Sequence, residues 1–308
     1  MRWLAKAAVQ GGLSLVPGGQ RANYFLQRNV SKRLPRSDAD FDFHAATAAR
    51  HLAALDRVDP GNERGALRCY EFGAGWDLIG PIAMWALGVE RQTVVDINPN
   101  VKLELVNDTV RRFADHRPRL ERALGSSLRP VDATPLTGLH QLPGRFGISY
   151  LAPQDARATP LPNGGVDFVS NTFTLEHINS QDIAAILRET RRVMAPGALI
   201  SSLIDMQDHY NYIDPKVSVY NYLRYPDWRW RFLNPGLQWQ NRLRHPLYLK
   251  LFEGAGFEVL LDEAQTATDS DLRELARIPL APEFRGFSEV EVAIRSTHLV
   301  ARPRRRPA

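Results

Sequence analysis

Apolar residues along this chain occur either in short continuous runs or at a spacing of three to four positions. Residues 180–194 show the second pattern, with apolar side chains at Ile183, Ile186 and Leu187, and the Pro-Gly pair at 196–197 ends the expected helix. Further helices are expected at 41–58, 81–87, 98–114 and 246–254. The short runs predict strands at 67–72, 93–97, 148–151, 166–173, 198–204, 257–261 and 292–300. Strands that alternate with helices in this way indicate an α/β sheet.

The length of 308 residues suits one large domain with additions. We expect this domain to span residues 41–300, after an N-terminal helical arm at 1–40 and before a basic tail at 301–308. Within the domain, residues 116–146 are rich in Arg, Pro and Gly and resemble an insertion.

A second insertion, residues 206–245, holds five of the nine tyrosines and three of the six tryptophans. It begins where the fifth strand is expected to end, which in an open α/β sheet is the edge where ligands bind. Two interpretations follow. The aromatic residues form a small core of their own, or the segment is a lid over a substrate pocket whose arginines (224, 229, 231, 242 and 244) contact sugar rings or phosphate groups.

Composition excludes several classes of protein. The single cysteine, Cys69, leaves no internal disulfide framework and no cysteine-based zinc finger. The net charge of +5 is concentrated in the last seven residues, which hold four arginines, and this argues against a nucleic-acid-binding surface on the folded domain. The sequence has no uninterrupted apolar run long enough for a membrane helix and no cleavage-site pattern after residue 16, so we expect a cytoplasmic protein.

A glycine-rich turn follows the first expected strand and carries the strongest chemical signal. It reads Glu71-Phe-Gly73-Ala-Gly75, and glycines at these positions let the backbone turn sharply and approach a ligand. Asp96 lies 21 residues after Gly75, near the end of the next strand. A carboxylate at that distance can accept hydrogen bonds from both hydroxyls of a ribose, so the pair indicates an adenosine ligand.

The same turn favours S-adenosylmethionine over a dinucleotide. A dinucleotide fingerprint starting at Gly73 would need glycine at position 78, where the chain has Leu78. The next glycine is Gly80, so the following helix starts too late to place its N-terminus at a pyrophosphate. Glu71 would repel a pyrophosphate but suits a ligand that carries an amino group. The sequence also has no phosphate-binding loop of the G-x-x-x-x-G-K-[ST] type.

On these residues the sequence resembles the class I S-adenosylmethionine-dependent methyltransferases, whose first motif is E/D-x-G-x-G. Asp96 in VVDINPN, Asp155-Ala156, the segment 166–178 and the segment 191–197 match further motifs of that family in order. The resemblance implies a Rossmann-like, doubly wound sheet of seven strands in the order 3-2-1-4-5-7-6, with the last strand antiparallel. It covers residues 65–205 and, less distinctly, 246–300.

The resemblance also implies roles for individual residues. Glu71, Gly73 and Gly75 would line the methionine and ribose region, and Asp96 would hold the ribose, with Ile97 against the adenine. Asp155 would accept from the adenine amino group beside the backbone N–H of Ala156, and Asn171 would face the cofactor. One departure is Asp77, where many members have a third glycine, and it affects the contacts to the methionine end.

Methyl transfer from a sulfonium mainly requires that donor and acceptor are aligned and that water is excluded. A hydroxyl acceptor also requires a base, and a histidine at the strand-end edge is suited to this work. We expect His209 to be that base, with Asp205 or Asp208 orienting its ring. His177 is the second candidate. No Asp/His cluster shows clear metal-ligand spacing, so no metal is expected.

Missing motifs narrow the acceptor. The fourth strand lacks the Asn/Asp-Pro-Pro-Tyr/Phe motif that is typical of amine methylation on nucleic acids, and Cys69 lies inside a strand rather than in a nucleophile position. We therefore favour a hydroxyl on a small molecule or a glycan precursor. Segments 17–28 and 208–228 also resemble, more loosely, bacterial methyltransferases of polysaccharide biosynthesis.

Two alternatives stay open. The chain is an RNA- or protein-directed methyltransferase that uses its arginine-rich tail, or it binds S-adenosylmethionine without catalysis, with Asp77 marking a decayed site. The sequence fixes neither the acceptor nor the oligomeric state.

Overall fold

The computed structural model describes residues 11–12, 24–25, 28 and 34–304. Most of the expected N-terminal arm therefore lies outside the described residues, as do residues 305–308 of the basic tail. Among the described helices, none combines the length and the apolar character needed to cross a membrane.

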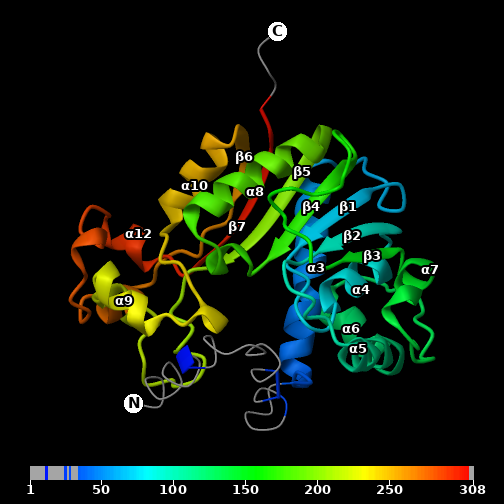
Figure 1. The fold of residues 1–308 in the computed structure, drawn as a ribbon, viewed down its shortest axis with the longest axis horizontal. Helices are drawn as coiled ribbons and strands as arrows, with labels where there is room; N and C mark the ends of the chain where they lie inside the picture. Colours follow the sequence, from blue (N-terminus) through cyan, green and yellow to red (C-terminus); the bar gives the residue numbers. More distant parts are fainter. Residues whose placement is uncertain (1–10, 13–23, 26–27, 29–33, 305–308) are drawn as a thin grey trace.

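Seven strands form one mixed sheet at the centre of the molecule (Figure 1). They are β1 (Arg68–Phe72), β2 (Arg91–Val95), β3 (Ile148–Leu151), β4 (Val166–Thr172), β5 (Met194–Asp205), β6 (Phe257–Asp262) and β7 (Ser296–Pro303). Their order is β3-β2-β1-β4-β5-β7-β6, with β1 to β5 parallel and β7 antiparallel to both of its neighbours. The predicted Rossmann-like sheet and its strand order are confirmed.

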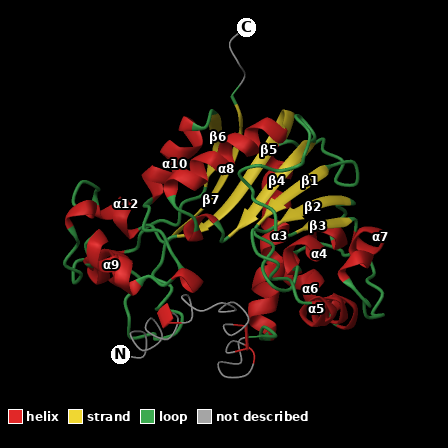
Figure 2. Cartoon of the chain, viewed as in Figure 1, coloured by secondary structure: helices red, strands yellow, loops and turns green. Residues whose placement is uncertain are grey.

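Helices cover both faces of this sheet (Figure 2). The α-helices are α3 (Asp38–Val58), α4 (Ile79–Ala86), α5 (Leu103–Asp115), α6 (Arg117–Leu124), α7 (Leu142–Phe146), α8 (Ser180–Val193), α9 (Asp227–Leu233), α10 (His245–Gly254), α11 (Asp269–Leu275) and α12 (Glu289–Ala293). Short 3₁₀ helices are η2 (Leu139–Gln141), η3 (Leu175–His177), η4 (Asn221–Arg224), η5 (Gly236–Gln238) and η6 (Pro282–Phe284).

Among the element boundaries that differ from the prediction, two have a clear local reason. The helix expected from Asn98 begins only at Leu103, because the Asp96 carboxylate accepts from the backbone N–H of Asn98 and holds a turn there. The last strand begins at Ser296 rather than at 292. Residues 289–293 form α12 instead, since Ser288 and Glu291 make a reciprocal capping box at its start.

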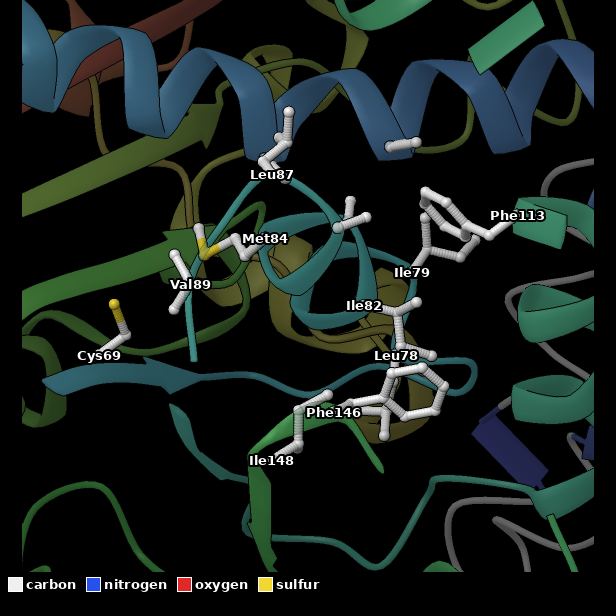
Figure 3. Packing of buried hydrophobic residues seen from close by; sticks show 14 of the residues in the cluster. Cys69, Leu78, Ile79, Ile82, Met84, Leu87, Val89, Phe113, Phe146 and Ile148 are labelled. Carbon is white, nitrogen blue, oxygen red and sulfur yellow. The ribbon is translucent and has the colours of Figure 1, made fainter. Parts of the chain in front are cut away.

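The sheet separates two apolar cores. On one face, α3, α4 and α5 pack on the strands with Phe41, Ile82 and Phe113 fully buried (Figure 3). Residues 116–146 contribute Leu120 and Phe146 to this same core through α6 and α7, so they pack as part of the domain. On the other face, α8 and α10 bury a second set that includes Ile183, Leu187, Tyr248 and Phe252.

A third apolar cluster joins the aromatic insertion to the segment between β6 and β7. Tyr220, Tyr222 and Trp230 pack there with Phe284 and Val292, beside the labelled helices α9 and α12 (Figure 1). Much of the aromatic content of residues 206–245 therefore forms a small core, which was the first of the two interpretations.

Two arginines of the insertion are structural, and the expectation that they contact substrate is wrong. Arg244 is completely buried and donates to the carbonyls of Met206 at 2.8 Å and Val292 at 2.7 Å. Arg242 is buried as well, and it pairs with Asp227 and with the carbonyl of Tyr222. Both guanidinium groups fasten the insertion to the domain.

Candidate active site

The glycine-rich turn leaves β1 at the carboxyl edge of the sheet and needs glycine at Gly73. Gly73 has a φ of +92°, and a Cβ there would lie 2.3 Å from Oγ1 of Thr174. Its N–H donates to the carbonyl of Val95 at 2.9 Å, which ties the turn to the end of β2. Gly75 has a φ of +65° and open space around it. Leu78, where a dinucleotide fingerprint would have glycine, adopts a left-handed conformation just before α4.

Asp96 connects this turn to the segment after β2. Its carboxylate accepts from the N–H of Ala74 at 3.1 Å and from the N–H of Asn98 at 2.9 Å. Desolvation raises the pKa of Asp96, while these backbone donors act in the opposite direction. The carboxylate thus fixes the shape of the loop while its residue lines the cavity described next.

A cavity of about 540 Å³ opens beside the glycine-rich turn, which is in the range of small-molecule and cofactor sites. The structure brings five of the predicted cofactor residues together in its wall: Gly73, Asp96, Ile97, Asp155 and Ala156. The Ile97 side chain is 59% exposed, so an apolar surface is available to a planar ring. The Asp155 carboxylate is held by Arg157, which lowers its pKa.

Three predicted cofactor residues do not contribute to this wall: Glu71, Gly75 and Asn171. The Glu71 carboxylate lies in the interior and accepts from Ser170 Oγ at 3.2 Å, and burial raises its pKa to about 7. Asn171 is completely buried and donates to Ser202 Oγ at 2.7 Å. Its side chain pairs with β5 instead of contributing to the wall of this cavity.

Sequence reasoning missed other residues of the wall. Trp76, Thr174 and Trp239 all line the cavity. Trp76 stood within the recognised motif, whereas Trp239 comes from the aromatic insertion, far away in the sequence. In the sequence, the only sign of this was that the insertion follows the fifth strand, at the edge of the sheet where ligands bind. Residues Gly236 and Leu237 line the cavity too, so part of the insertion forms its wall, while a lid over a substrate pocket stays a prediction.

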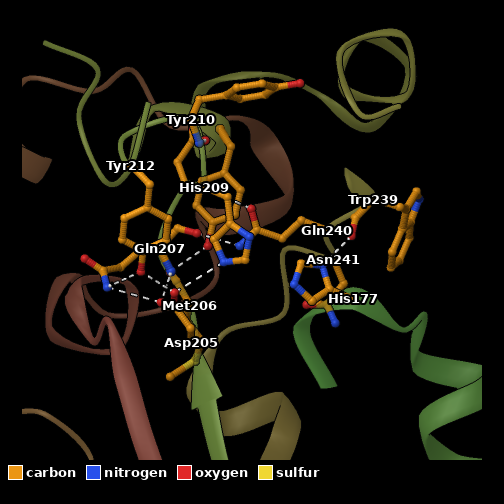
Figure 4. Close-up of polar contacts among 12 residues, drawn as sticks. His177, Asp205, Met206, Gln207, His209, Tyr210, Tyr212, Trp239, Gln240 and Asn241 are labelled. Carbon is orange, nitrogen blue, oxygen red and sulfur yellow. Dashed lines mark hydrogen bonds and ion pairs between the residues drawn. The ribbon is translucent and has the colours of Figure 1, made fainter. Parts of the chain in front are cut away.

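The predicted histidine and one of its two predicted partners meet at the end of β5 (Figure 4). Nε2 of His209 lies 3.2 Å from Oδ2 of Asp205. The same carboxylate accepts from the hydroxyl of Tyr212 at 2.5 Å and from the N–H of Gln207 at 3.0 Å. These contacts hold Asp205 in place, and they favour it as the residue that orients His209.

Asp208 has other partners. It is completely buried, and its carboxylate accepts from the N–H of Tyr210 at 2.8 Å and from Nδ2 of Asn221 at 3.0 Å. Desolvation raises the pKa of Asp208 to about 6. These bonds stabilise the loop after β5, so the structure does not support Asp208 as the orienting residue.

His177 joins the two parts of the site. It lines the cofactor cavity, and its ring centroid lies 5.0 Å from that of His209 (Figure 4). Glu176, His177 and His209 each offer one ligand atom, and these atoms lie within 4.8 Å of one another. Nothing in the sequence indicated this group, because His177 in η3 and His209 in the loop after β5 lie 32 positions apart.

Cys69 is buried within β1, and burial raises the pKa of its thiol to about 12. A protonated, enclosed thiol cannot act as the nucleophile of carbon methylation.

A family model described as a methyltransferase domain matches residues 139–201, from η2 to β5. No curated protein matches the chain.

Three solved structures that are similar to this chain share 12% to 18% sequence identity with it. One is an S-adenosylmethionine-dependent methyltransferase from Mesorhizobium loti, with 18% identity, a TM-score of 0.43, and coverage of 83% of this chain and 99% of that chain. Another is geranyl diphosphate C-methyltransferase from Streptomyces coelicolor A3(2), solved with Mg²⁺, geranyl diphosphate and S-adenosyl-L-homocysteine. It shows 12% identity, a TM-score of 0.45, and coverage of 83% of this chain and 76% of that chain. A methyltransferase from Leishmania major has 12% identity and a TM-score of 0.46, over 97% of this chain and 83% of that chain.

Proposed function

We propose that this chain, a class I S-adenosylmethionine-dependent methyltransferase, transfers the methyl group to a hydroxyl of a small molecule or a glycan precursor. The family and the cofactor follow from the matched methyltransferase domain, the strand order and the glycine-rich turn followed by Asp96. The acceptor and the roles of single residues are the proposal.

In this proposal the cofactor occupies the cavity beside the turn. Asp96 accepts from the ribose hydroxyls, Ile97 packs on the adenine, and Asp155 accepts from the adenine amino group beside Ala156. Gly73 lets the backbone approach the methionine end. These roles are supported by one observation: the residues line the same cavity, namely Gly73, Asp96, Ile97, Asp155 and Ala156.

The acceptor site follows from one observation: His177 lines the cofactor cavity and also contacts the ring of His209, which is paired with Asp205. An acceptor hydroxyl bound next to His209 and Asp205 lies close to the side of His177 that lines the cavity. In the reaction the bond from sulfur to the methyl carbon breaks and a bond from oxygen to that carbon forms. The sulfonium becomes a neutral thioether, and the hydroxyl loses its proton. His209, whose ring is oriented by Asp205, accepts this proton as the base.

Exposed aromatic and basic side chains on the insertion support a sugar-like or phosphate-bearing acceptor. Trp228 is 65% exposed and Phe232 is 82% exposed, in the same helix as the exposed residues Arg229 and Arg231. Aromatic faces stack on sugar rings, and guanidinium groups pair with phosphate.

The test uses S-adenosylmethionine labelled in its methyl group. The enzyme is incubated with labelled cofactor and whole-cell extract, which is then separated into small-metabolite, glycan, lipid, protein and RNA fractions. We expect label in the glycan or small-metabolite fraction, released under conditions that cleave methyl ethers, and less label with the Asp96→Ala variant at subsaturating cofactor. Label found only in RNA or protein would contradict the proposed acceptor.

A further inference from the structure

Glu176 is in an unusual environment for a carboxylate. It follows β4 in η3 and is 1% exposed, and its carboxylate receives no hydrogen bond from a side chain among the described residues. The donors that face it are the backbone N–H groups of Glu176 itself and of Asp205. No ion pair with a basic residue is found for it in this part of the chain either. An unpaired buried carboxylate costs several kcal/mol, so this position calls for a partner that the protein itself does not supply.

Two imidazoles beside Glu176 are arranged as ligands. Nδ1 of His177 lies 2.8 Å from the carbonyl oxygen of Trp239, and a carbonyl only accepts, so Nδ1 carries the proton. Nε2 of His177 therefore has a free lone pair. A ring nitrogen that donates to a backbone carbonyl while the other bears a lone pair is the usual arrangement of a metal-bound histidine. Nε2 of His209 faces Oδ2 of Asp205 at 3.2 Å, and a carboxylate only accepts, so Nε2 carries the proton and Nδ1 has the lone pair.

We propose that Glu176, His177 and His209 bind a divalent first-row transition-metal ion, such as Zn²⁺ or Mn²⁺. One ligand atom from each residue lies within 4.8 Å of the others, which a single ion can bridge after small side-chain movements. Two imidazole nitrogens and one carboxylate oxygen suit these ions, whereas Mg²⁺ prefers a shell made of oxygen atoms. Asp205, whose Oδ2 lies 3.2 Å from His209, adds a second negative charge that a divalent cation balances.

The ion gives the proposed reaction a way to activate its acceptor, and this role rests on the proposed function. His177 is exposed on its cavity side, so an acceptor hydroxyl can reach the ion from the cofactor site. Binding to the ion lowers the pKa of the hydroxyl, whose proton passes to water, and the resulting oxygen anion takes the methyl group from sulfur. In this site His209 acts as a ligand of the ion and no longer as a free base.

The experiment measures metal binding directly. The full chain is treated with a chelator, dialysed, and titrated with ZnCl₂ and with MnCl₂ in a calorimeter, with MgCl₂ as a comparison. We expect one tight site for Zn²⁺ or Mn²⁺, and Glu176→Gln to weaken it about 100-fold or more. The matched control is Glu258→Gln, which removes an exposed carboxylate from β6 and leaves the affinity unchanged. If the untreated and chelator-treated chains show no site, or if both variants bind equally well, the metal site is excluded.

A second measurement separates loss of binding from loss of folding. Without metal, Glu176→Gln removes a buried charge, so its thermal unfolding temperature is expected to equal or exceed that of the wild type. Added Zn²⁺ is expected to raise the unfolding temperature of the wild type and of Glu258→Gln only. An equal Zn²⁺-dependent rise in Glu176→Gln would overturn the assignment.

Activity then distinguishes the two proposals. If methyl transfer to a hydroxyl acceptor proceeds equally with and without the chelator, the metal site fails while the proposed function stands. If metal binds at Glu176 but label appears only in RNA or protein, the proposed acceptor fails while the metal site stands.

Discussion

At the scale of single residues, Asp96 has two roles, and the sequence indicated only one of them, the contact with the ribose. Its carboxylate accepts from Ala74 and Asn98, and its position in the cavity wall suits the ribose. We predict that Asp96→Ala weakens S-adenosylmethionine binding by about 1–3 kcal/mol, the cost of leaving buried polar partners unsatisfied. Calorimetric titration measures this change. Asp132→Ala, which removes an exposed carboxylate outside the cavity wall, serves as the control. If Asp96→Ala changes the binding free energy by less than about 0.3 kcal/mol, Asp96 does not contact the ribose.

His209 is expected to affect turnover without affecting the cofactor. It does not line the cavity beside the glycine-rich turn, and its ring contacts Asp205, His177 and Tyr212. We predict that His209→Ala lowers kcat by roughly 10²–10⁴-fold, the scale of losing a group that assists proton removal, with little change in cofactor affinity. Turnover and cofactor titration are measured on the same preparation, beside His140→Ala as a distant histidine control. Unchanged turnover in His209→Ala would exclude it from the mechanism.

At the scale of elements, the close contact between the glycine-rich turn and η3 gives a prediction with an internal rescue. In Gly73→Ala the new Cβ would lie 2.3 Å from Thr174 Oγ1 at a φ of +92°, whereas Gly75→Ala meets only the cost of a positive φ. We predict that Gly73→Ala lowers the free energy of unfolding by about 1–3 kcal/mol more than Gly75→Ala and weakens cofactor binding further. Urea unfolding measures the difference. Adding Thr174→Ala should recover part of the loss, and an equal effect of both glycine variants would contradict the contact.

Predictions from the sequence were best where local pattern decides the structure. Apolar runs identified β1 to β6 to within a few residues, although β5 begins at Met194 and includes the Pro-Gly pair that was expected to precede it. Prediction was wrong where a distant or neighbouring side chain overrode the local pattern, as at Asn98, whose N–H is held by Asp96, and at 292–295, where the Ser288 cap favours a helix. Arg244 illustrates the same limit. Nothing in its neighbourhood in the sequence shows that carbonyls from two remote segments bury it.

The residues of the candidate site also divide into those that could be placed from the sequence and those that could not. The glycine-rich turn, Asp96 and Asp155 follow strands directly and could be placed by spacing, because parallel strands end at one edge of the sheet. The group of Glu176, His177 and His209 could not, since only the pairing of β4 with β5 brings its two segments together. Asn171 was misplaced because its strand is covered on both faces, so that alternation did not reveal which face it occupies.

At the scale of the whole molecule, a polar chain buried between α3 and the sheet ties together elements from both halves of the sequence. His51 of α3 contacts Ser201 of β5 at 2.7 Å, and Ser201 contacts His298 of β7 at 2.7 Å. His298 in turn lies 3.6 Å from Glu263, which also pairs with Arg57. Burial lowers the pKa of His298 to about 4 and that of His51 well below its usual value, with Arg50 adding to both effects.

These lowered pKa values make stability depend on pH in a defined direction. Above pH 6.5 both histidines are neutral whether the chain is folded or unfolded. Between pH 6.5 and about 4 the unfolded chain takes up protons that the folded chain excludes, so stability falls as the pH falls. Each histidine contributes a slope of up to about 1.4 kcal/mol per pH unit.

We predict that the free energy of unfolding in urea, measured from pH 7.5 to 4.5, declines less steeply in His298→Asn than in the wild type, by roughly 1 kcal/mol per unit. His298→Asn will also be less stable at pH 7.5, because Ser201 loses a partner, so the comparison uses slopes and not absolute values. Parallel slopes in the two proteins would mean that His298 titrates in the folded chain as it does in the unfolded one.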